Sequence, residues 1–284
     1  MHLPWRAHLD LEFAQRADST IMIRNRHEGP LQVQKALYPE RRDVCHIAVL
    51  HPPGGIAAGD TLAVRSTLGP GSRVLLTTPG AAKWYRADEG EGGGNGAQQN
   101  LNFSVGRDAV LEWLPRENIF FRGSDISMNF DVALSGSAKY VGWEILGFGR
   151  RAGGERWDRG RLRMRTSVRR DGRLLWLETA DIDARSGFAA SAVGLAGATV
   201  SGTLLVASGE VDDVLLKECR EVDASLELAR EGARIGVTRV PGVLIARYLG
   251  DSTQDAFRWF THLWSVLRPA MLGREPCSPR VWAC

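Results

Sequence analysis

Residues 161–180 read RLRMRTSVRRDGRLLWLETA. Asp171-Gly172 divides this stretch into two extended runs, and an Asp-Gly pair between such runs is typical of a tight hairpin turn. The turn requires positive φ, which Gly adopts freely and Asp tolerates. This is the clearest hairpin signal in the chain, and it predicts two antiparallel strands within a β-rich fold.

Short strands are also predicted throughout the preceding part of the chain. Their sequences are rich in Val, Ile, Leu and Thr and are bounded by Gly, Pro or Asp, as strands usually are. The predicted strands cover residues 19–26, 29–37, 44–51, 61–67, 72–78, 98–105, 109–114 and 128–134.

Helical periodicity appears only late, where apolar residues recur at spacings of three and four in segments at about 211–230 and 253–270. The predicted fold class is therefore mainly β, with many short strands and two α-helices. No fixed-period repeat or hydrophilic linker divides the chain, so residues 1–284 are predicted to form one domain. A flexible glycine-rich loop is expected at about 88–97, and a C-terminal helix plus tail at about 253–284.

Charge and composition favour a cytoplasmic protein. The 36 basic and 33 acidic residues are interspersed and give a net charge of +3, which calls for neither nucleic acid nor a membrane surface as a partner. The N-terminal residues lack signal-peptide features, and no apolar run is long enough to span a bilayer. The four cysteines are scattered like reduced cytosolic thiols.

Common catalytic motifs are absent from the sequence: there is no Walker loop, no H-E-x-x-H and no G-x-S-x-G. His51 ends a predicted strand at a Pro-Pro-Gly-Gly turn, which leaves open a role as a transient metal ligand beside that of an ordinary structural histidine. Cys277 and Cys284 form a C-x6-C pair, which is compatible with a weak soft-metal site or with free thiols.

A series of motifs then resembles one known family. His51-Pro-Pro-Gly-Gly55, Gly59-Asp60, Leu76-Thr-Thr-Pro-Gly80 and Lys83-Trp-Tyr-Arg86 are similar to the signature stretch of the UreD (UreH) urease accessory proteins. Matching motifs follow in order, among them Leu111-Glu-Trp-Leu-Pro115, Trp143-Glu-Ile145, Leu267-Arg-Pro269 and Pro279-Arg-Val-Trp282. The resemblance covers nearly the whole chain, although Trp84 and Glu144 stand where the family commonly has Phe and Asp.

The resemblance implies a β-helix-like body with two helices and a non-enzymatic maturation factor. Members of this family act with UreF and the GTPase UreG on apo-urease to deliver nickel to its metallocentre. The resemblance further implies that Ni²⁺ passes through the protein interior and that no cofactor is tightly bound. A dimer within the accessory complex is also compatible with the family.

Three carboxylates fall on motif positions where the family carries inward-facing acids: Asp60, Glu144 and Glu178. Spaced single carboxylates suit transit because an ideal four-ligand cage would trap the ion. Asp60 is equally compatible with a turn aspartate, and Glu144 and Glu178 with solvent-facing or arginine-paired acids.

Four residues are candidate partner contacts. Lys83 and Arg86 would meet acidic groups of a carrier complex, although such cations are usually only solvated. Trp259 and Val266 lie on one stripe of the C-terminal helix, off its main apolar face, and would dock a partner if they are not part of the core.

Two other classes of function stay open at this point. A β-helical carbohydrate-acting enzyme would use paired carboxylates as acid and base. A pure protein-interaction module would have no metal role.

Overall fold

The hairpin predicted from residues 161–180 is confirmed. Strand β13 (Gly160–Arg170) pairs antiparallel with β14 (Arg173–Asp183). The two turn residues, Asp171 and Gly172, have φ angles of 49° and 79°, as the Asp-Gly signal requires.

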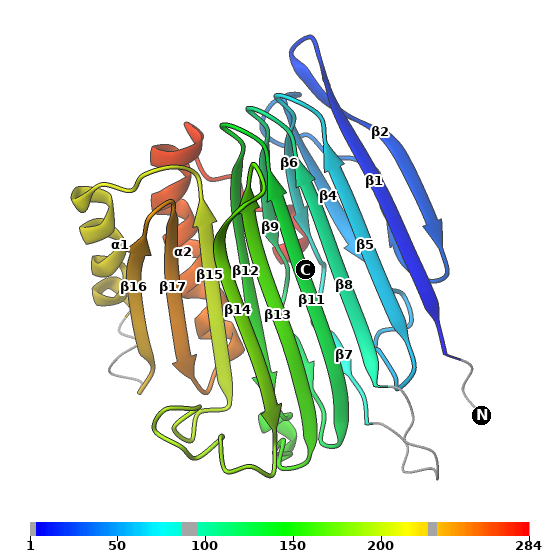
Figure 1. Cartoon of the computed structure of the whole chain (residues 1–284), viewed down its shortest axis with the longest axis vertical. Coiled ribbons are helices and arrows are strands. Elements are labelled where there is room, and N and C mark those ends of the chain that lie inside the picture. Colours follow the sequence, from blue (N-terminus) through cyan, green and yellow to red (C-terminus); the bar gives the residue numbers. More distant parts are fainter. Residues whose placement is uncertain (1–3, 87–95, 227–231, 284) are drawn as a thin grey trace.

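The structure is a computed structural model, and it describes residues 4–86, 96–226 and 232–283. Two β-sheets lie face to face, and two α-helices cover the outer face of the second sheet (Figure 1). One apolar core fills the space between the sheets, and another lies between the second sheet and the helices.

The first sheet has seven strands in the order β14-β13-β11-β8-β5-β1-β2. Its remaining strands are β1 (Arg6–Arg16), β2 (Ser19–Glu28), β5 (Thr61–Leu68), β8 (Ala97–Val105) and β11 (Ser124–Leu134).

The second sheet has ten strands, eight of them in the order β16-β17-β15-β12-β9-β6-β4-β3, with β10 and β7 attached beside β12. The bounds are β3 (Gln32–Val33), β4 (Val44–Leu50), β6 (Arg73–Thr77), β7 (Ala82–Trp84), β9 (Val110–Leu114), β10 (Asn118–Phe120), β12 (Lys139–Phe148), β15 (Val200–Ala207), β16 (Arg234–Val240) and β17 (Val243–Gly250).

From β4 to β13 the chain passes back and forth between the sheets. Successive strands within each sheet are parallel: β5, β8, β11 and β13 in the first, and β4, β6, β9 and β12 in the second. This winding is that of a β-helix-like body. The predicted fold class, mainly β with two helices, is confirmed.

Individual strands differ from the sequence prediction in places. The strand expected at 29–37 is reduced to Gln32–Val33, while β1, β7, β10, β12, β15, β16 and β17 were not predicted. Strand β12 is buried on both faces and contains Gly142 and Gly147, so it shows no apolar-polar alternation to reveal it.

The two predicted helices are α1 (Asp213–Leu226) and α2 (Thr253–Leu272). Ser252 caps α2 by accepting a hydrogen bond from the Asp255 amide (3.1 Å), and Gly273 ends the helix with a φ of 65°. The predicted extension of the first helix over 227–230 lies outside the described residues.

A buried polar network fastens α2 to the sheet. Arg268, whose side chain is 1% exposed, donates to both oxygens of Glu112 on β9 (3.0 to 3.3 Å) and to both oxygens of Glu40 (2.6 and 3.0 Å). Trp264 Nε1 also donates to Glu112 (2.6 Å). We call this group the Arg268 network.

Neither described helix combines the length and apolar character needed to cross a membrane. Most of the predicted glycine-rich loop, residues 87–95, lies outside the described part of the chain.

Candidate functional site

Strand pairing in the second sheet places three polar side chains in a row that faces the first sheet. Glu144 on β12 is the cross-strand partner of Thr203 on β15, which is the partner of Arg247 on β17. Because side chains alternate along a strand, Trp143 points to the helices while Glu144 points between the sheets.

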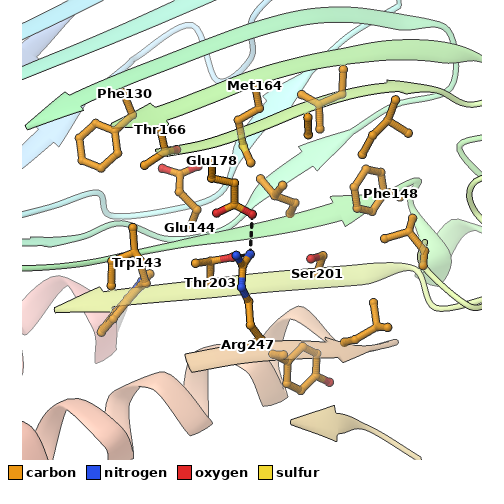
Figure 2. Close-up of a pocket in the computed structure, with 18 of the residues that line it drawn as sticks. Phe130, Trp143, Glu144, Phe148, Met164, Thr166, Glu178, Ser201, Thr203 and Arg247 are labelled. Carbon is orange, nitrogen blue, oxygen red and sulfur yellow. Dashed lines mark hydrogen bonds and ion pairs between the residues drawn. The ribbon is translucent and has the colours of Figure 1, made fainter. Parts of the chain in front are cut away.

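Glu178 enters the same space from β14 of the first sheet. Arg247 Nη1 donates to Glu178 Oε1 (2.6 Å) and also to Thr203 Oγ1 (2.7 Å). Figure 2 shows this ion pair joining the two sheets, with Glu144 beside it in the same cavity. The pair is only partly shielded, since the Glu178 and Arg247 side chains are 22% and 43% exposed.

Two cavities lie between the sheets. The Glu178 cavity, about 250 Å³, has mainly apolar walls with a few polar groups: Glu144, Thr166, Glu178, Ser201, Thr203 and Arg247. The His51 cavity, about 320 Å³, includes His51, Lys83, Gln99, Arg116, Asn118 and Glu144 among its lining residues. Glu144 lines both cavities and therefore stands at their junction.

Burial raises the pKa of Glu144 to about 7, with a partial opposing effect from the Trp113 side chain. Asn118 Nδ2 donates to its carboxylate at 3.5 Å from Oε2, which is a long hydrogen bond. Glu144 therefore changes charge near neutral pH and is only weakly bound by its neighbours.

His51 presents a ring nitrogen to which no atom in the described part of the chain is hydrogen-bonded. Its Nε2 is buried with no hydrogen-bond partner among the described residues. Burial lowers the pKa of His51, and Asp60 opposes this only in part. The ring is thus neutral at pH 7, which is the form that binds metal ions.

Asp60 does not share a cavity with the two glutamates. It is 1% exposed, and its oxygens accept hydrogen bonds from the backbone amides of Trp5 (2.7 Å) and Ala57 (2.8 Å). This geometry is that of a turn aspartate that also holds the start of the N-terminal strand. The charge of Asp60 also acts on His51.

Lys83 and Arg86 are both exposed near the end of β7. Lys83 lies at the wall of the His51 cavity, and Arg86 lines a surface hollow with Arg122 and Arg159. The two cations are therefore placed where a partner could reach them.

Trp259 is 1% exposed and packs against Tyr248 of β17, with ring centroids 6.5 Å apart. Of the two alternatives open for Trp259, core packing is the one observed and the proposed docking role is wrong, because α2 is covered by the sheet, by α1 and by the tail residue Trp282. Val266 is partly buried against the same core.

Cys277 is a partly buried free thiol whose pKa is raised by burial, and Cys284 lies outside the described residues. Among the described residues, no three His, Cys, Asp or Glu side chains cluster in a way that would hold a metal ion.

Arg247 and Thr203 were missed by the sequence reasoning. The sequence does contain a signal for Arg247, because a single arginine follows the four apolar residues 243–246 of β17. Thr203 shows no comparable signal, since threonine is common in strands.

These features define a two-sheet β-helix-like scaffold with two neighbouring cavities that share Glu144. A family model described as UreD urease accessory protein matches residues 6–283. Curated relatives named urease accessory protein UreD include one from Dechloromonas aromatica, 47% identical over 285 residues (99% of this chain, 96% of the relative). Others come from Methylobacillus flagellatus, 45% identical over 278 residues (98% and 94%), and Pseudomonas aeruginosa, 42% over 283 residues (99% and 96%).

The chain belongs to the UreD family of urease accessory proteins. Proteins of this kind are maturation factors rather than enzymes, so the chain has a role in urease maturation. The family assignment removes the carbohydrate-acting enzyme as an alternative.

Proposed function

We propose that this protein passes Ni²⁺ through the space between its sheets during urease maturation. The observation that carries the proposal is that Glu144 lines two cavities, one containing Glu178 and the other His51. An ion entering one cavity would meet an oxygen or nitrogen ligand in each, with Glu144 between them.

The ligands suit an ion in transit. Carboxylate oxygen and neutral imidazole both bind Ni²⁺, and few such groups at any one point allow release. Glu144 is held by one long hydrogen bond, and Glu178 by one partly exposed ion pair. Asp60 is the weakest member of the predicted path, because its oxygens already hold two backbone amides.

In this proposal the protein acts with UreF and the GTPase UreG on apo-urease in the cytoplasm. Lys83 and Arg86 are our candidates for contacts with acidic groups of these partners. Both are exposed, Lys83 at the wall of the His51 cavity and Arg86 in a surface hollow with Arg122. The remaining alternative, an interaction module without a metal role, predicts that the cavity charges do not matter.

Replacing Glu178 by Gln tests the proposal, because it keeps shape and removes the charge. The matched control is Asp181→Asn, which removes an exposed carboxylate from the same strand; Asp181 pairs with Arg161. Glu178→Gln should lower urease activation at limiting nickel by about tenfold, as loss of a charged ligand generally costs a kcal/mol or more. High nickel should restore part of the activity.

The measurement is urease activity per assembled accessory complex across a nickel titration. Assembly is quantified separately for each variant. Superimposable curves for the parent, Glu178→Gln and Asp181→Asn would remove the nickel path and favour the interaction module.

A further inference from the structure

Arg247 is the cation that neutralises Glu178 in the structure. Its Nη1 group bonds Glu178 across the gap between the sheets and is anchored at the same time on Thr203 of its own sheet. The guanidinium carbon also lies 5.8 Å from the centroid of the Trp176 ring. Arg247 therefore occupies the position that an incoming cation would take beside Glu178.

We infer that Arg247 is an internal latch: it holds Glu178 until a divalent cation displaces it, and it reclaims Glu178 when the cation leaves. This inference rests on the proposed nickel path and adds to it a residue that sets how tightly the cavity holds the ion.

The strength of the pair suits such exchange. Partly exposed ion pairs contribute little net stability, because both groups are well hydrated when separated. A divalent ion with a carboxylate gains more from the Coulomb interaction than a delocalised guanidinium does. Trp176, on β14 of the opposite sheet, offers the displaced guanidinium a cation–π contact during the exchange.

Competition from Arg247 also explains how the cavity can carry carboxylates without trapping the ion. Glu144 and Glu178 line the same cavity, and two free carboxylates would hold a divalent ion more firmly than either alone. With Arg247 present, release of the ion is coupled to formation of the Arg247–Glu178 pair. The latch therefore lowers affinity and favours onward movement.

Replacing Arg247 by Gln tests the latch, with Ni²⁺ binding to the purified full chain measured by isothermal titration calorimetry. We expect binding about three- to tenfold tighter than the parent, because one competing cation has been removed. The matched control is Arg163→Gln: Arg163 pairs with Asp125 at 2.6 Å, with side chains 42% and 35% exposed, and neither residue lines the Glu178 cavity. It should bind Ni²⁺ as the parent does.

Thr203→Val is a second variant that keeps every charge and removes only the anchor of the latch. It should tighten Ni²⁺ binding by about twofold, since a neutral hydrogen bond contributes modestly. Thermal melting of each variant shows which proteins are folded. If Arg247→Gln does not fold, Ni²⁺ binding to Thr203→Val tests whether Arg247 competes with the ion.

Measuring Glu178→Gln beside Arg247→Gln separates the latch from the proposed nickel path. Weaker binding in Glu178→Gln with parent-like binding in Arg247→Gln would overturn the latch and leave the nickel path intact. Parent-like binding in both would remove the Glu178 cavity from the nickel path, and the latch with it. Tighter binding in Arg247→Gln with weaker binding in Glu178→Gln supports both.

Discussion

An arginine–glutamate group lies against each face of the second sheet, and the two groups differ in how exposed and how fully hydrogen-bonded they are. On the helix side, Arg268 and Glu112 are 1% and 3% exposed, and both carboxylate oxygens of Glu112 accept hydrogen bonds. On the cavity side, Arg247 and Glu178 are 43% and 22% exposed, with one direct bond between them.

The same residue types thus serve two purposes according to their surroundings. Burial alone would raise the pKa of Glu40, a member of the Arg268 network, but hydrogen bonds from His46 and Arg268 outweigh burial and lower it. In the cavity, burial dominates and raises the pKa of Glu144 to about 7. The fully hydrogen-bonded Arg268 network stabilises the fold. The weakly bonded charged groups of the cavity can exchange one partner for another.

The largest expected effect comes from breaking the Arg268 network. Arg268→Met should lower the free energy of unfolding by about 3 to 5 kcal/mol, because two buried carboxylates lose their counter-charge. Arg247→Met should cost about 1 kcal/mol or less, as for other partly exposed pairs. Urea unfolding of both variants measures the difference, and equal losses would show that the two groups are not distinct.

A smaller effect is expected from the titration of Glu144. Its folded-state pKa of about 7 exceeds the ordinary value of 4.5, so the folded protein retains a proton that the unfolded chain releases. The resulting stabilisation is complete below about pH 4.5 and is lost as pH rises through about 7.

Glu144→Gln removes this pH dependence. From pH 5 to pH 8 the parent should lose about 1 to 2 kcal/mol relative to the variant, less than the full shift implies because water can enter the cavities. Urea unfolding at a series of pH values measures the difference. Parallel pH profiles for the two proteins would show that Glu144 is ionised at pH 5 and is not the weakly bonded acid described above.

Local sequence patterns predicted much of this fold. Asp171-Gly172 fixed the hairpin because the turn geometry depends on those two residues alone. The alternation of Leu9, Leu11 and Phe13 with polar residues is a local signal for β1 of the same kind.

The contacts of the site could not be predicted in the same way. Glu178 and Arg247 are 69 residues apart in sequence and meet only because the sheets stack. Trp259 is buried although it lies off the main apolar stripe of α2, because α2 is covered on more than one side. Tertiary packing, which no local pattern records, decided both outcomes.

The most direct test of the nickel path is to locate the ion. A crystal of the protein soaked in Ni²⁺ and measured at the nickel absorption edge should show an anomalous peak in the Glu178 cavity. The ion should lie between the carboxylates of Glu144 and Glu178, with Arg247 moved away from Glu178. Peaks confined to surface histidines or Cys277, with the Arg247–Glu178 pair intact, would contradict a path between the sheets.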